Sequence, residues 1–204
     1  MELFDALTHM RAMKRLKPDP VPEELLRKVV EYATHAPSGL NAYNLRYIVV
    51  RDREKKAAIG RMYRQAWNEY VAHSSSIPAG QTAEVVERTN KAVTWQANHL
   101  HEVPALIFVC MAGIRAGLSH PTFARGANGQ AWVAIQNLML ACRGMGLGAA
   151  ITTLHLEHEK EIDELLGIPE DSASFAMVPV GYPMGKFGPT RGVPVEHVLR
   201  WDSW

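Results

Sequence analysis

Hydrophobic residues recur along the chain at two spacings, and each spacing predicts a different kind of element. Residues 3–10 carry apolar side chains at helical spacing, and the prolines that follow the basic run 11–17 end this helix. Amphipathic patterns predict further helices over residues 23–35, 52–70, 84–101 and 158–166. Apolar and β-branched runs predict strands over residues 45–50, 104–111, 149–153 and 174–181. A helix over residues 129–145 is apolar nearly all round, which predicts a place at the centre of the protein.

The order of these elements predicts an α+β fold. Helices outnumber strands, and they separate the strands without the regular βαβ rhythm of a doubly wound sheet. The length of 204 residues predicts a single domain over 1–204. The tail, residues 182–204, is rich in proline but ends in two tryptophans. We expect it to bury them by wrapping over a neighbour, most simply a second copy of the chain.

Charge and cysteine content narrow the function classes. The net charge of +1 argues against a nucleic-acid partner or an anionic membrane partner, because both are bound by an excess of lysine and arginine. The uncharged stretch 126–142 is interrupted by amide side chains and is too short to span a membrane. Cys110 and Cys142 each lie in an apolar run, where a reduced core thiol is expected. With no signal-peptide pattern, these features predict a cytoplasmic protein.

Motif searches exclude several chemistries. The chain has no GxGxxG or Walker loop, and its glycine-rich run 144–148 ends a helix, where a helix cap and close packing are expected. His155 and His158 lack a second ligand pair at metal-binding spacing, so we predict no metal site and expect both as solvated residues beside a helix start. No nucleophile elbow is present either. These motifs identify no catalytic side chain, and a pair of catalytic carboxylates stays open.

Basic residues and small polar loops lie far apart in the sequence. Each alone is typical of solvated surface, but together they suit a phosphate held by cations and a planar polar ligand contacted by amide and hydroxyl groups. These residues are Arg11, Lys14, Arg15, Ser38 to Asn41, Thr152, Thr153 and Arg191.

Several segments, in this order, resemble the nitroreductase family of FMN-dependent oxidoreductases, and the resemblance covers nearly the whole chain. The segments are residues 10–16 with KPDPVPEELL after them, APSGLN at 36–41, GLGAAITT at 146–153, ELLGIP at 164–169 and VPVGYP at 178–183. The resemblance implies an α/β sandwich with a central, mainly antiparallel sheet flanked by helices. It also implies an intertwined homodimer, with FMN at the subunit interface and the tail reaching across the partner.

The resemblance also implies the residues that contact FMN. The segment 11–15 would face the phosphate and ribityl chain, and the loop 37–41 would approach the flavin from the other subunit. Thr152 and Thr153 would lie beside the isoalloxazine ring, where a backbone N–H can bond N5, and Arg191 would return from the tail to the phosphate. The residues assigned in this way are Arg11, Ala12, Lys14, Arg15, Pro37, Ser38, Gly39, Asn41, Thr152, Thr153 and Arg191.

The chain departs from the family pattern at three places. Met10 stands where the family commonly has arginine, and Ala12 stands where it has serine, so one phosphate contact and one hydroxyl are missing. Arg15 is a candidate substitute. Residues 43–45 (YNL) replace the family's Gln-Pro-Trp, which changes the expected shape of the pocket.

The activity implied by the resemblance is a ping-pong cycle. NADH or NADPH would give a hydride to FMN, and a nitroaromatic, quinone or activated enone would then take the electrons. Because the cofactor carries this chemistry, no catalytic side chain is needed. Two alternatives stay open: a flavoenzyme of the same scaffold that carries out oxidation, dehalogenation or flavin breakdown, and a non-catalytic flavin-binding protein.

Overall fold

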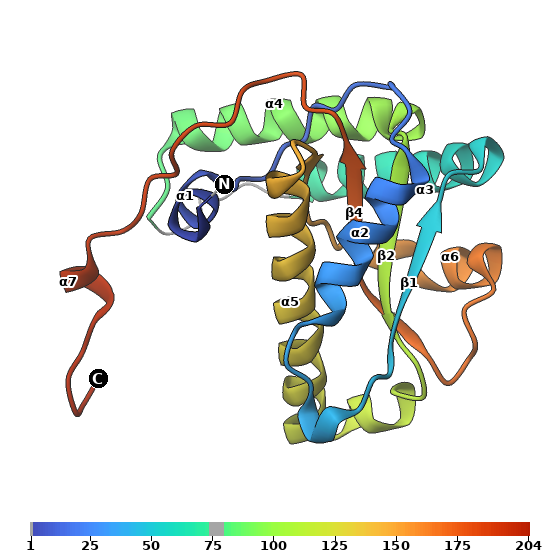
Figure 1. Cartoon of the computed structure of the whole chain (residues 1–204). Coiled ribbons are helices and arrows are strands. Elements are labelled where there is room, and N and C mark those ends of the chain that lie inside the picture. The colour runs from blue at the N-terminus through green and yellow to red at the C-terminus, as the bar shows by residue number, and fades with distance from the viewer. Residues whose placement is uncertain (1, 74–79) are drawn as a thin grey trace.

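A four-stranded antiparallel sheet in the order β1-β2-β4-β3 forms the middle of the computed structural model (Figure 1). The structure describes residues 2–73 and 80–204. Three consecutive serines, Pro78 and Gly80 predict a loop over residues 73–81, and most of it lies outside the described residues. The strands are β1 (Leu45–Val50), β2 (Ala105–Met111), β3 (Gly148–Ala149) and β4 (Ala173–Gly181). Three of them confirm the predicted strands. β3 is shorter than predicted, since beyond it Thr152 forms only an isolated bridge with Met177.

The alternation of side chains along β2 divides the core into two layers. Ile107 and Val109 face one side of the sheet, whereas Leu106 and Phe108 face the other, and all four are fully buried. Successive residues of a strand point to opposite faces, so a fully buried strand needs a helical layer on each side. This arrangement confirms the predicted α+β sandwich.

The helices cover both faces of the sheet. Their bounds are α1 (Leu3–His9), α2 (Glu23–Thr34), α3 (Arg53–His73), α4 (Ala83–His99), α5 (Pro121–Gly144), α6 (Glu159–Leu166) and α7 (Val195–Val198). Helices α2 and α5 pack together on the Ile107 side, whereas α3 and α6 contribute to the Phe108 side. In Figure 1, α2 and α5 run side by side.

The prediction for α5 was wrong in two respects. The helix begins at Pro121, well before residue 129, because proline suits a first helical position, where its missing N–H would have no partner in any case. The helix is also not central within one chain. Ile135 and Leu138 are fully buried, but Trp132 and Val133 are 38% and 39% exposed. One chain therefore leaves an apolar side of α5 open to a neighbour.

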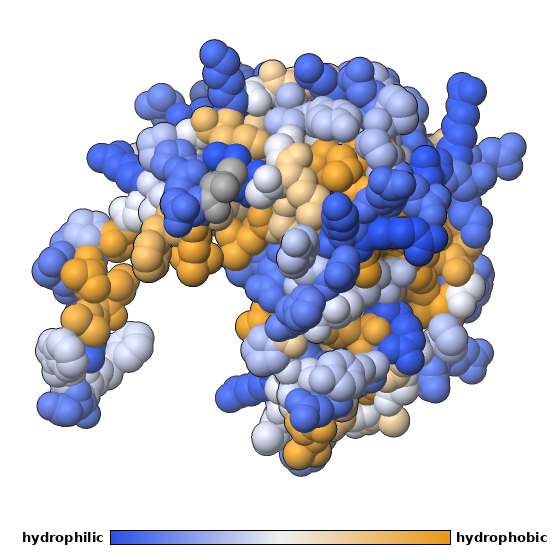
Figure 2. Space-filling view, in the orientation of Figure 1, coloured by the Kyte–Doolittle hydropathy of each residue, from blue (hydrophilic) through white to orange (hydrophobic). Residues whose placement is uncertain are grey.

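The end of the tail stands away from the rest of the chain. Residues 189–204 are exposed, including Trp201 at 79% (Figure 1). Figure 2 shows hydrophobic side chains on this segment and on the surface beside it.

Two absences concern the described part of the chain. No helix in it is long and apolar enough to cross a membrane. No three His, Cys, Asp or Glu side chains gather in it as metal ligands.

The two thiols match the prediction for reduced core cysteines. Cys110 and Cys142 are free and buried, and burial raises the pKa of each to about 12. Thiols held neutral in this way are poor nucleophiles.

Candidate functional site

The basic N-terminal segment is held in place by backbone hydrogen bonds. The N–H of Met13 donates to the carbonyl of Ala149 at 2.8 Å, and the N–H of Lys17 donates to the carbonyl of Tyr182 at 2.7 Å. The extended segment 11–17 therefore lies between β3 and the start of the tail. Its side chains are presented by a fixed backbone rather than by a free terminus.

Gly148 makes this close approach possible. A Cβ atom at this position would stand 2.7 Å from Leu16 Cδ2 and 2.9 Å from Met13 Cβ. Both distances are shorter than ordinary van der Waals contact, so only glycine fits here without a shift of the segment.

We therefore predict that Gly148→Ala destabilises the protein by about 1–3 kcal/mol through overpacking against the buried Leu16. Gly144→Ala is the matched control, because a Cβ at Gly144 would meet nothing within 4 Å. Chemical denaturation of both variants checks this. Equal stability of the two variants would contradict the packing argument.

The structure brings the N-terminal cations and the tail together. Arg11 Nη1 lies 3.8 Å from the position that a Cβ would take on Gly188, and the N–H of Thr190 donates to the carbonyl of Thr8 at 2.7 Å. Arg191 directly follows this anchored position.

These cations have no carboxylate partner in the described residues. No Asp or Glu oxygen there lies within 4.0 Å of the side-chain nitrogens of Arg11, Lys14, Arg15 or Arg191. Lys14 is half-buried, and its desolvation lowers the pKa of its ammonium group. Partly desolvated cations without counter-charges favour binding of an anion.

Thr152 is fixed by contacts from two sides. Its N–H donates to the carbonyl of Met177 at 3.0 Å, and its Oγ1 lies 3.1 Å from the hydroxyl of Tyr63 on α3. Tyr63 is 1% exposed, and burial raises the pKa of its phenol.

Tyr63 was not predicted from the sequence. The available signal was its helical spacing with Ile59 and Trp67 on the buried face of α3.

Thr153 differs from Thr152 because it is exposed. Its N–H has no hydrogen-bond acceptor within the ranges that the structure describes. A free backbone donor beside a fixed threonine suits a polar ligand atom.

The loop 37–41 lies at the other end of the sheet. Leu45, just after this loop, pairs with Met111, whereas Ala105 at the far end of β2 pairs with Val180 beside Ala149. Seven residues of β2 span about 20 Å, and Figure 1 shows the loop far from the start of the tail.

The structure therefore gathers one part of the predicted site and leaves another apart. Arg11, Ala12, Lys14 and Arg15 lie beside the strand that leads to Thr152 and Thr153, and Arg191 follows the anchored start of the tail. Pro37, Ser38, Gly39 and Asn41 do not join them within one chain. That the loop contacts FMN from a second subunit remains a prediction.

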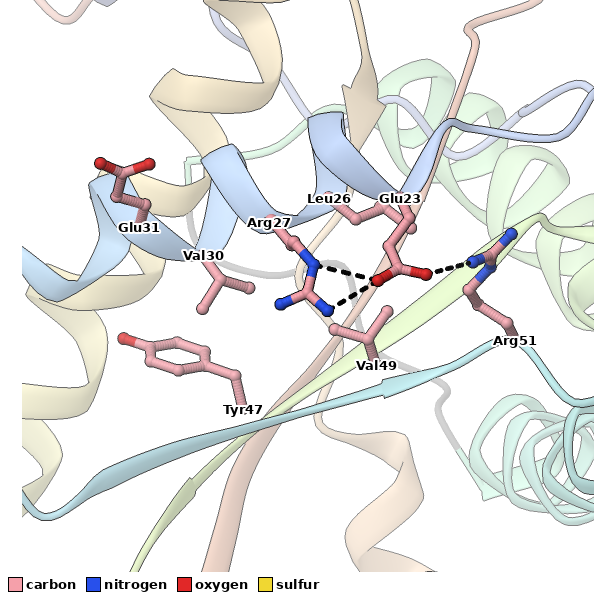
Figure 3. Close-up of a pocket in the computed structure, with 8 residues that line it drawn as sticks. All are labelled: Glu23, Leu26, Arg27, Val30, Glu31, Tyr47, Val49 and Arg51. Carbon is pink, nitrogen blue, oxygen red and sulfur yellow. Dashed lines mark hydrogen bonds and ion pairs between the residues drawn. The ribbon is translucent and has the colours of Figure 1, made fainter.

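A groove of about 550 Å³ lies between α2 and β1, away from the predicted FMN residues (Figure 3). At one end Arg27 and Arg51 pair with Glu23 at 2.7 and 3.4 Å. Further along, the hydroxyl of Tyr47 is buried and lacks a hydrogen-bond partner among the described residues. Burial raises its pKa to about 12. Because β1 is an edge strand, this groove borders an unpaired sheet edge.

His155 contradicts the expectation of a solvated residue. It is 1% exposed, its Nε2 lies 3.1 Å from Ser174 Oγ, and its ring meets the edge of Phe108. Burial lowers its pKa to about 4. The local sequence did not reveal this, because the turn 154–158 inserts the ring under β4 through contacts distant in sequence.

This burial predicts acid sensitivity. In the unfolded chain the imidazole binds a proton near its ordinary pKa of about 6.5, but in the folded chain only near 4. The unfolded state therefore gains protons first, and stability falls as the pH drops from 6.5 toward 4. We predict a loss of about 2 kcal/mol between pH 7 and 5 through His155.

Chemical denaturation of the cofactor-free protein at the two pH values checks this. His155→Gln should flatten the dependence, whereas His101→Gln, at an exposed position, should leave it unchanged. An equal slope in wild type and His155→Gln would refute the assignment to His155.

Comparisons with known proteins identify the family that this chain resembles. The model of the nitroreductase family matches residues 7–182. A protein named NADH dehydrogenase from Thermus thermophilus is 30% identical over 200 residues, covering 94% of this chain and 91% of that relative. An iodotyrosine deiodinase from Thermotoga neapolitana is 27% identical, covering 89% of this chain and 88% of that relative.

A solved structure shares the fold over the full length of both chains. It is an oxidized iodotyrosine deiodinase bound to FMN and 3-iodo-L-tyrosine, with a TM-score of 0.77 and 24% identity, and it covers 100% of each chain. The family model and the relative from Thermus thermophilus support a single assignment. The chain belongs to the nitroreductase family.

Proposed function

We propose that this protein is an FMN-dependent oxidoreductase that takes reducing equivalents from NADH or NADPH and passes them to a nitroaromatic, quinone or activated enone in a ping-pong cycle. The observation that carries the proposal is the cation cluster of Arg11, Lys14, Arg15 and Arg191, which has no carboxylate partner in the described part of the chain. The first three stand on a fixed backbone. The cluster supplies what a dianionic phosphate needs, namely several N–H donors with no competing carboxylate.

The residues present fit the phosphate of FMN despite the departures at Met10 and Ala12. Ala12 forms a backbone bridge with Ala149, so its role of presenting the backbone is kept without a hydroxyl. Arg11 lies against Gly188, and Lys14 is half-buried with no carboxylate partner among the residues that the structure describes. Arg15 is exposed on the same segment and can replace the cation missing at Met10.

When bound, FMN supplies the hydride chemistry, and the chain orients and holds it. The free N–H of Thr153 is the donor proposed for the flavin N5 edge. Tyr63 holds Thr152 in place and thereby fixes the adjoining N–H of Thr153. No acid or base side chain is required for these roles.

We further infer that the protein works as a homodimer in which each chain completes the partner's site. The loop 37–41 is too distant to serve its own chain, and Trp132 leaves an apolar side of α5 open. The tail exposes Val198 and Trp201, and burial of these apolar side chains against a second chain would be favourable. We assign the partner's tail to the groove between α2 and β1, which borders the edge strand of the described sheet.

A second candidate function is reductive dehalogenation of an aromatic substrate. Two of the similar proteins reported above are iodotyrosine deiodinases, and one of them is bound to FMN and 3-iodo-L-tyrosine. The replacement of the family's Gln-Pro-Trp by residues 43–45 favours keeping this candidate, because it alters the expected pocket.

Anaerobic reduction tests the proposal. FMN-loaded protein is mixed with NADH or NADPH, and then with a quinone, a nitroaromatic or 3-iodotyrosine. We expect the flavin absorption to bleach with a nicotinamide donor and to return with the quinone or nitroaromatic. The dehalogenase is supported if dithionite reduces the flavin but neither nicotinamide does, and if 3-iodotyrosine then reoxidises the flavin and releases iodide. Bound flavin without turnover supports a binding protein.

A further inference from the structure

An arginine that the sequence reasoning did not select lies close to the predicted phosphate site. Arg143 is near the end of α5, and its guanidinium carbon lies 4.3 Å from the centroid of the Phe187 ring. Its Nε is buried and has no hydrogen-bond partner within residues 2–73 and 80–204. A buried donor without an acceptor lowers the stability of the fold, which suggests that Arg143 has a functional role.

Phe187 belongs to a short part of the tail that is fastened at both ends. The N–H of Met184 donates to the carbonyl of Arg15 at 3.0 Å, and the N–H of Thr190 donates to the carbonyl of Thr8 at 2.7 Å. Both anchors attach this part of the tail to the N-terminal segment. Between them the Phe187 ring gives a further attachment, directed toward α5.

The residue after Phe187 contacts the cation cluster. Gly188 lies beside Arg11, whose Nη1 is 3.8 Å from the position of a Cβ on that glycine. Arg143 therefore holds the part of the tail against which Arg11 rests. In the chain's described portion, Arg143 has no carboxylate within 4.0 Å, so no ion pair competes with its contact to the ring.

We propose that Arg143 is a positioning residue of the FMN phosphate site, acting through Phe187 to fix the start of the tail and with it the place of Arg11. The inference rests on the proposed function. Cation–π contacts of a partly desolvated arginine are strong enough to affect affinity measurably. Arg143 is half-buried, and its guanidinium adds positive charge next to the part of the tail that Arg11 contacts, which favours the dianionic phosphate over a neutral ligand.

Equilibrium titrations with FMN and with riboflavin test this role, because riboflavin lacks the phosphate. We expect Arg143→Met and Phe187→Leu each to weaken FMN binding about tenfold and to leave riboflavin affinity unchanged. The double variant should be no weaker than the single variants, because both remove the same contact. Arg125→Met, at an exposed position of the same helix, is the matched control and should bind FMN like wild type.

Each outcome decides one claim. Wild type that binds no FMN refutes the proposed function and, with it, this inference. Wild type that binds FMN, together with an Arg143→Met variant of equal affinity, overturns the role of Arg143 alone. An equal loss for FMN and riboflavin also overturns it, because it indicates general damage to the fold. Thermal unfolding of the cofactor-free variants establishes that they fold, and Arg143→Lys replaces Arg143→Met if that variant does not.

Discussion

Arg11→Gln combined with Lys14→Gln is expected to weaken FMN binding by about 10²- to 10⁴-fold. Each substitution removes a charged donor from the phosphate, and a hydrogen bond to a charged group contributes about 1.5–3 kcal/mol. Lys14 is half-buried, so water cannot replace its hydrogen bond to the phosphate as readily as it could at an exposed position. The segment itself should stay in place, because Met13 and Lys17 hold it through backbone atoms.

Quenching of FMN fluorescence measures this effect, and riboflavin again separates the phosphate from the ring. We expect riboflavin affinity to be nearly unchanged in the double variant. Arg64→Gln with Lys55→Gln, two exposed positions on α3, is the matched control for the loss of two charges. A control that weakens FMN binding as strongly as the double variant does would refute the proposed phosphate site.

Ending the chain after Gly192 is expected to produce a monomer that no longer retains FMN. The deletion keeps Arg191 and removes α7 with the exposed apolar residues Val195, Val198 and Trp201. Burial of such side chains against a second chain contributes about 1.5–3 kcal/mol each, so their loss removes most of the driving force for tail docking. In the proposed dimer, loss of the partner also removes the partner's loop 37–41 from the site.

Light scattering during size exclusion gives the mass of the truncated protein, and its absorption spectrum gives the retained flavin. Glu196→Gln in the full chain keeps the apolar side chains and should remain a dimer with FMN. A truncated dimer that still binds FMN would show that the tail does not hold the subunits together.

Local sequence patterns were sufficient to predict those strands whose own apolar residues already indicate that they are buried. The strand predicted over residues 45–50 matches β1, and the run 104–111 matches β2 to within one residue. Both are dense in β-branched or aliphatic residues, so sequence and burial agree. The start of α5 was missed, because Gly126 and Gly129 weaken the helical pattern although both are exposed and tolerated there.

Residues whose environment comes from distant segments could not be found in this way. His155 is buried by Phe108 and Ser174, and Arg143 contacts Phe187 across many intervening residues. Nothing adjacent in sequence marks either position. The predicted cations, in contrast, were selected from the sequence and assigned to FMN through the resemblance, whereas the contact of Arg11 with Gly188 became visible only in the fold.

Native mass spectrometry of the purified protein after addition of FMN tests the central claim most directly, because it reads subunit and cofactor stoichiometry together. The account predicts a species with two chains and two FMN molecules, and no species with one chain and one FMN. A monomer that holds FMN alone, or a dimer that takes up none, would contradict the claim that two chains jointly build each site.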